Sequence, residues 1–254
     1  ILRILILLFR AISRISNLLF RVNYERLNLL FRDFRVIIRS YYGYTILKGS
    51  DGMLKRKIYD ALVTWKNSSK GTTAMMIDGA RRVGKSFIAE QFAKAEYKSY
   101  ILIDFGRAPT DVLDLFVNDS ADLDLFFAKL AAFYSTTLHK RESLIIFDEV
   151  QQYPRARQLI KYLVADGRFD YLETGSLIRL KKNVQDIIIP SEEDHIGIFP
   201  LDFVAFLWAM GDEMTMPFIR MCFEGKKPMG PMHRKTMELF RQYMIVGGMP
   251  QAVE

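Results

Sequence analysis

The hydrophobic residues after position 53 follow two patterns. Short, nearly continuous apolar runs predict buried strands, and such runs occupy 74–77, 97–105, 144–149, 169–176 and 195–200. Other segments place an apolar residue every three or four positions, which predicts helices, at 53–66, 87–94, 109–116, 122–138, 154–166, 201–210 and 232–246. Strands and helices therefore alternate up to residue 200, and helices follow.

The loop between the first strand and the next helix carries a glycine-bounded motif. Residues 79–86 read G-A-R-R-V-G-K-S, which fits the pattern G-x-x-x-x-G-K-S of a phosphate-binding loop. Gly79 and Gly84 permit backbone conformations that a side chain forbids. Backbone N–H groups and the positive end of the following helix then surround an anionic phosphate chain. The predicted nucleotide-binding residues are Gly79, Ala80, Arg81, Arg82, Val83, Gly84, Lys85 and Ser86.

Four residues of the motif and of a later strand carry the predicted chemistry. Lys85 is expected to reach the β- and γ-phosphates, and the hydroxyl of Ser86 to hold Mg²⁺. The apolar run 144–149 ends in two acids, of which Asp148 is expected to hold the same Mg²⁺ through water. The second acid, Glu149, is expected to polarise the attacking water. The alternative interpretation of this run is a strand followed by a solvated acidic turn.

Polar side chains end the strand at 169–176. Thr174 and Ser176 are candidates for a hydroxyl that contacts the γ-phosphate or the attacking water. The alternative for each is an ordinary polar turn between a strand and a loop. The basic tract 181–183 has two interpretations as well, a phosphate or partner contact and an exposed loop.

The composition excludes several other chemistries. Cys222 is the single cysteine, which excludes an internal disulfide framework and a cysteine-based zinc cluster and favours a reducing, cytoplasmic location. The three histidines lie far apart, without metal-ligand spacing. Residues 1–50 hold nine basic residues against two acids, an excess of seven that equals the whole net charge of +7. The rest of the chain therefore gives no overall electrostatic argument for DNA binding.

Residues 1–52 differ in composition from the rest of the chain. Eight of their nine basic residues are arginine, and the first methionine is Met53, which suits an ordinary start position. One interpretation is upstream sequence translated in frame. A second is a basic amphipathic helix lying on an anionic membrane surface, because six arginines share a helical face. A membrane span or signal is the third, although the apolar run 4–9 is too short for either.

From Met53 onward the chain resembles a prokaryotic family of AAA-type ATPases, in which a domain of unknown function follows the ATPase core. Dispersed segments in the right order carry the resemblance, and they are residues 79–86, 100–105, 143–151, 171–182, 199–208 and 247–250. The resemblance implies an α/β fold, a P-loop NTPase three-layer sandwich with a five-stranded parallel sheet in the order 5-1-4-3-2. It implies Mg²⁺-ATP at the carboxyl edge of that sheet, which agrees with the general rule for open α/β sheets.

The family's roles carry over to Lys85, Ser86, Asp148 and Glu149, but no arginine finger can be chosen among Arg155, Arg157 and Arg168. The expected organisation is a basic extension at 1–52, an ATPase core at 53–200, and a helical region at 201–254 that begins a truncated C-terminal domain.

The leading functional hypothesis is a Mg²⁺-dependent ATP hydrolase whose nucleotide state is coupled to a protein or DNA partner. That partner is expected to contact the portion after Glu254, and an oligomer is an open alternative. The second hypothesis is a nucleotide-gated binding module with little hydrolysis of its own. A third, a kinase-like transferase, is disfavoured because a water-activating Glu149 suits hydrolysis better.

Overall fold

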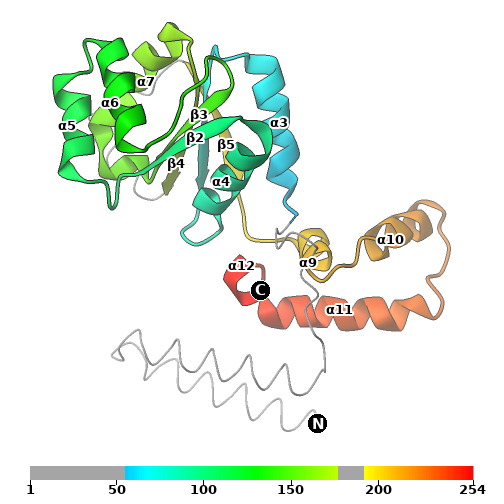
Figure 1. Cartoon of the computed structure of the whole chain (residues 1–254). Helices are drawn as coiled ribbons and strands as arrows, with labels where there is room; N and C mark the ends of the chain where they lie inside the picture. The colour runs from blue at the N-terminus through cyan, green and yellow to red at the C-terminus, as the bar shows by residue number, and fades with distance from the viewer. Residues whose placement is uncertain (1–54, 177–191, 254) are drawn as a thin grey trace, which may run out of the picture. The chain divides into compact units, whose positions relative to one another are not determined.

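The computed structural model describes residues 55–176 and 192–253. Within them, five strands form one parallel sheet in the order β2-β3-β4-β1-β5 (Figure 1). Read from the β5 edge, this is the predicted order 5-1-4-3-2, which is therefore confirmed. The strands are β1 Ala74–Gly79, β2 Ser99–Asp104, β3 Ser143–Asp148, β4 Asp170–Ser176 and β5 Glu193–Ile198.

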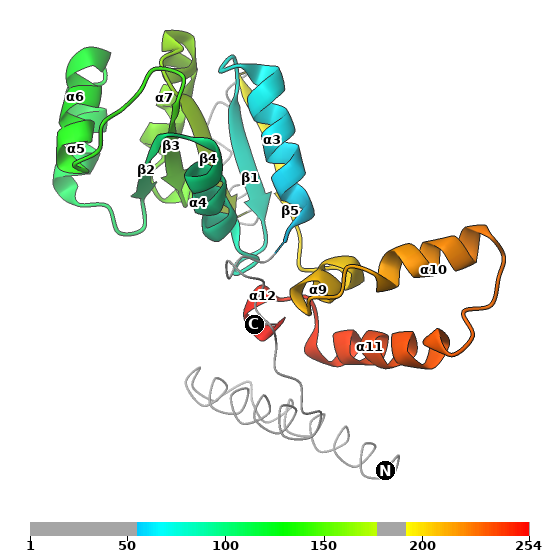
Figure 2. The same ribbon diagram turned by 45° about the vertical axis from the view of Figure 1, so that its right-hand side comes forward.

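Helices cover both faces of the sheet and make three layers (Figure 2). On one face lie α3 Lys57–Ser69 and α4 Lys85–Glu96, and on the other lie α5 Thr110–Asn118, α6 Leu123–Phe133 and α7 Pro154–Asp166. Strand β3 shows why its run is continuously apolar. Ile145 and Phe147 belong to the core under α5–α7, whereas Leu144 and Ile146 belong to the core under α3 and α4. A strand covered on both faces needs apolar residues at every position.

One predicted helix is shorter than the sequence pattern indicates. The helix expected at 122–138 ends at Phe133, and Ser135 takes a left-handed backbone conformation with φ of 49°. The backbone N–H of Thr136 then donates to the carbonyl of Ala131 at 3.0 Å, which closes the helix end. Three hydroxyl residues in a row, 135–137, explain the early stop, because their side chains compete with helical backbone hydrogen bonds.

Helices alone follow the last strand. They are α9 Phe203–Ala209, α10 Thr215–Glu224, α11 Met232–Val246 and α12 Pro250–Val253. Helix α9 packs on α11 through aromatic rings, with the centroids of Phe206 and Tyr243 5.4 Å apart. In the described residues 55–176 and 192–253 no helix is both long and apolar enough to cross a membrane. The segments 1–52 and 181–183, for which the sequence left alternatives open, lie outside the described residues.

Candidate active site

The carboxyl ends of β1, β3 and β4 bring the predicted chemical groups together. The hydroxyl of Ser86, at the start of α4, lies 2.7 Å from Asp148 Oδ1 at the end of β3. Thr174, near the end of β4, donates its hydroxyl hydrogen to the same oxygen of Asp148. Three elements distant in sequence therefore meet at one carboxylate, because parallel strands end at the same edge of the sheet.

The phosphate-loop motif links β1 to α4 in the expected way. Gly79 lies against β5 so closely that a Cβ on it would come within 2.3 Å of the carbonyl oxygen of Ile198. Gly84 takes a left-handed conformation with φ of 91° directly before the first residue of α4. Val83 is buried and anchors the loop, whereas Ala80, Arg81 and Arg82 are exposed. The first turn of α4 holds no acidic residue, so its positive end is free to attract an anion.

The amine of Lys85 lies inside this loop. It donates to the carbonyl of Ala80 at 2.8 Å and to that of Gly79 at 3.3 Å. Burial lowers the pKa of Lys85, and the carboxylates of Glu149, Asp148 and Asp78 oppose that shift. The amine is thus a partly desolvated cation held between backbone carbonyls and acids, which suits a polyanionic ligand.

Asp148 is buried among groups that affect its charge in opposite directions. Burial raises the pKa of Asp148, the hydrogen bonds from Thr174 and Ser86 lower it, and the carboxylates of Asp104 and Glu149 raise it further. Asp104 stands directly beside Asp148 in the register of β2 and β3. A divalent cation at this edge would stabilise the ionised form of Asp148.

Glu149 leaves the strand with a left-handed backbone, φ of 54°, and its N–H donates to Thr174 Oγ1 at 3.1 Å. The short helix η2 Val150–Gln152 follows it. The side-chain amide of Gln151 donates to Glu149 Oε2 and accepts from the N–H of Ser176 at 3.4 Å. Sequence reasoning assigned no role to Gln151, and its position two residues after the acid pair is the one signal that marked it.

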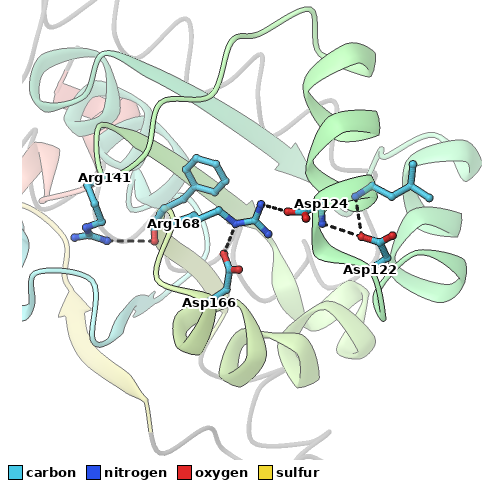
Figure 3. A network of polar contacts seen from close by, with 7 residues as sticks. Asp122, Asp124, Arg141, Asp166 and Arg168 are labelled. Atoms are coloured by element: carbon cyan, nitrogen blue, oxygen red, sulfur yellow. Dashed lines mark hydrogen bonds and ion pairs between the residues drawn. The ribbon is translucent and has the colours of Figure 1, made fainter.

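The three candidate arginines all have partners within the chain. Figure 3 shows Arg168 between Asp166 and Asp124, with Nε 2.7 Å from Asp166. Arg168 precedes β4, so it lies at the amino edge of the sheet, opposite the site. Arg155 donates to the carbonyl of Phe116 at 3.1 Å, and Arg157 is buried with Nη2 2.9 Å from Glu193.

A pocket of about 180 Å³ opens beside the phosphate loop. Its β5 residues Gly197 and Ile198 pair in register with Asp78 and Gly79. Phe199, 74% exposed, stands on its rim. The lining residues are 56–58, 197–202 and Ala205. The start of α3 and the segment after β5 thus make a mostly apolar hollow next to the loop.

A profile of the AAA domain family matches residues 71–207, just over half of the chain. The chain belongs to the AAA domain family. This AAA protein therefore has the P-loop α/β fold of that family of nucleotide-binding domains. One similar solved structure is titled "Structure of C. elegans PCH-2", with 12% identity and a TM-score of 0.35 over 67% of this chain. The chain spans about half of that structure's length, 47%. No curated protein matches this chain.

The family profile covers every residue for which a role was predicted, from Gly79 to Ser176. The roles of the individual residues stay predictions, and the contacts between these residues define them more closely. Ser86, Asp148 and Thr174 share one hydrogen-bonded cluster, and the carboxylates of Asp148 and Glu149 act on the nearby Lys85 amine. Ser176 donates its backbone N–H to Gln151, whose amide in turn contacts Glu149.

Proposed function

We propose that this AAA protein binds ATP with Mg²⁺ at the carboxyl edge of the sheet and hydrolyses it. The observation that carries the proposal is the contact between Ser86 and Asp148, which joins the phosphate loop to the acid-bearing strand β3. A hydroxyl and a carboxylate are both oxygen ligands of the kind that Mg²⁺ prefers. Lys85 beside them supplies the positive charge that a triphosphate needs.

The phosphate loop and Asp148 then have roles in binding. The loop 79–86 and the first turn of α4 surround the β- and γ-phosphates with N–H groups. Lys85 exchanges the carbonyls of Gly79 and Ala80 for phosphate oxygens. Ser86 and Asp148 would hold Mg²⁺, Ser86 directly and Asp148 through water, and the metal would neutralise charge on the phosphates.

Hydrolysis would use Glu149 as the general base. Its carboxylate accepts a proton from a water molecule whose oxygen forms a new bond to the γ-phosphorus. The bond from the γ-phosphorus to the bridging oxygen breaks, and that oxygen keeps the electron pair. The products are ADP and inorganic phosphate. Lys85 stays on the phosphates and offsets the negative charge that gathers on the leaving oxygen.

The pocket beside the loop is the proposed position of the base. Its walls include Ile58, Ile198 and Leu201, which are apolar, and Phe199 offers an aromatic face at the rim. Such a lining suits a flat heteroaromatic ring. Because Gly79 packs directly on Ile198, a base in this pocket and phosphates in the loop can belong to one nucleotide.

The test compares the unchanged chain with Glu149→Gln and Lys85→Met in steady-state ATPase assays with Mg²⁺ and with EDTA. We expect Glu149→Gln to lower turnover by about 10²–10⁴-fold while ATP still binds. Lys85→Met is expected to weaken ATP binding itself. Turnover by Glu149→Gln near the rate of the unchanged protein, or turnover that EDTA leaves intact, would overturn the proposal.

A nucleotide-gated binding module is the second candidate, and one observation favours it. Helices α10 and α11 and the turn before them expose large apolar side chains, Met214, Met221, Phe223, Met244 and Ile245, which are 59–83% exposed. Such side chains suit a partner. A chain that binds ATP but hydrolyses it only slowly, with or without DNA, would support the module over the hydrolase.

A further inference from the structure

Gln151 is a buried glutamine, 5% exposed, whose two amide atoms both have partners in the candidate site. Its Nε2 donates to Glu149 Oε2, and its Oε1 accepts from the N–H of Ser176. The next residue, Gln152, is exposed and has no side-chain hydrogen bond in the described part of the chain. Two adjacent residues of the same type therefore have opposite environments.

The two partners of Gln151 allow only one orientation of its amide. A carboxylate can only accept a hydrogen bond and a backbone N–H can only donate one. A flipped amide would place its oxygen against the Glu149 carboxylate and its NH₂ against the Ser176 N–H, and both contacts would be repulsive. The Ser176 N–H at the end of β4 and the Glu149 carboxylate therefore hold the amide of Gln151 in the same orientation.

A second connection runs parallel to the first. Thr174, two residues earlier on β4, accepts from the N–H of Glu149 and donates to Asp148. The end of β4 thus holds the backbone of Glu149 through one side chain and its carboxylate through another. A shift of this strand end would move both ends of Glu149 together.

We propose that Gln151 is a positioning residue that links the end of β4 to the carboxylate of Glu149. The inference rests on the proposed function, in which Glu149 activates the attacking water and a γ-phosphate lies near the end of β4. Binding of a triphosphate at that edge displaces the Ser176 N–H, the amide of Gln151 follows it, and the Glu149 carboxylate changes orientation. Gln151 is not placed against the nucleotide, so its loss is expected to change turnover by a larger factor than affinity.

The matched pair Gln151→Ala and Gln152→Ala tests this role. Gln151→Ala is expected to lower kcat by about 10- to 100-fold, the cost of a misplaced catalytic group, and to change KM and the Kd values for ATP and ADP by a much smaller factor. Gln152→Ala is expected to stay within about twofold of the unchanged protein in every constant. Equal kcat values for both variants would overturn the inference.

Gln151→Glu supplies a readout that a purely structural role would not move. It keeps an oxygen toward the Ser176 N–H but places a second carboxyl against Glu149. Two facing carboxyls share a proton, because both cannot easily be ionised at so short a distance. The acidic limb of the plot of kcat against pH should therefore move to higher pH. An unchanged limb in a folded Gln151→Glu variant would contradict the proposed contact.

Hydrogen exchange of residues 149–153 separates this inference from the proposed function. We expect exchange in the unchanged protein to differ between ADP and the β,γ-imido analogue of ATP, and this difference to disappear in Gln151→Ala. If Glu149→Gln abolishes turnover while Gln151→Ala does not change kcat, the inference fails and the function stands. If the unchanged protein does not hydrolyse ATP, the proposed hydrolysis fails, and the exchange difference decides the inference alone.

Discussion

Thr174 donates a hydrogen bond to Asp148 from a position with no solvent exposure, 26 residues further along the chain. The same hydroxyl oxygen accepts from the N–H of Glu149 at 3.1 Å. A single threonine therefore ties the proposed metal-holding acid to the backbone of the proposed base. Thr174 therefore contacts both acids from the neighbouring strand. The sequence predicted only that a hydroxyl would lie at the polar end of this strand.

Thr174→Val removes the hydroxyl at nearly constant volume. It leaves the N–H of Glu149 without its partner, which costs about 1–3 kcal/mol of stability, while Asp148 Oδ1 keeps the hydrogen bond from Ser86. We expect lower thermal stability and a lower kcat, measured by calorimetry and by ATP turnover. Thr174→Ser keeps the hydroxyl and should restore most of both, whereas failure of this rescue would argue against the hydrogen-bonding role.

Lys85 should make ATP binding pH-dependent on the alkaline side. Burial lowers the pKa of this amine in the free protein, so binding at alkaline pH requires uptake of a proton. Affinity is therefore expected to fall as pH rises through that lowered pKa, earlier than for an ordinary lysine. Fluorescence titration of an ATP analogue from about pH 7 to 10 measures this. Lys85→Arg, which stays charged, should bind more weakly but with a flat profile.

Glu173 should make the folded protein less stable as pH rises. It is fully buried with no hydrogen bond to either oxygen in the described residues, and burial together with the neighbouring Glu193 raises its pKa, against the attraction of Arg157. The folded state then binds more protons than the unfolded chain between the unfolded and folded pKa values, so stability falls across that interval. The imidazole of His195, with Nε2 3.5 Å from Glu193, is a further titratable group in contact with this cluster.

Glu173→Gln removes this titration. We expect a higher Tm at neutral pH, by about 2–4 °C for each kcal/mol recovered, and no advantage below the usual glutamate range. Thermal unfolding across a pH series provides the measurement. Glu142→Gln, at an exposed glutamate, serves as the control and should follow the unchanged protein. If the Tm of Glu173→Gln differs from that of the unchanged protein by the same amount at every pH, the prediction is wrong.

Gly248→Ala should loosen the helical region. A Cβ on Gly248 would lie 2.1 Å from the carbonyl oxygen of Leu201, whose N–H donates to Gly248 at 2.6 Å. In this variant the turn after α11 can therefore no longer pack against the segment after β5. Limited proteolysis should cut residues 246–250 faster in this variant. Gly230→Ala, in open space with φ of 56°, is the control, and equal cleavage of both would count against the contact.

Much of the fold could be predicted from the sequence because its signals are local. The apolar runs locate five strands within one or two residues, and Pro154 and Gly167 bound α7 where they stand in the chain. The order of the strands came from the family resemblance, since a run of apolar residues does not say which strand lies beside it. The helix after residue 122 was predicted too long because apolar periodicity continued past residues that favour turns.

The candidate site divides in the same way. By itself the sequence determined the phosphate loop, the helix that follows it and the acid pair after a buried strand, because each is a contiguous pattern with its own backbone chemistry. Only the tertiary structure decided that Ser86 meets Asp148 from 62 positions away, and that Gln151 joins Glu149 to the end of β4. It also assigned intrachain partners to the three candidate arginines. The physical reason is that parallel strand pairing, not distance along the chain, determines which side chains share one edge of the sheet.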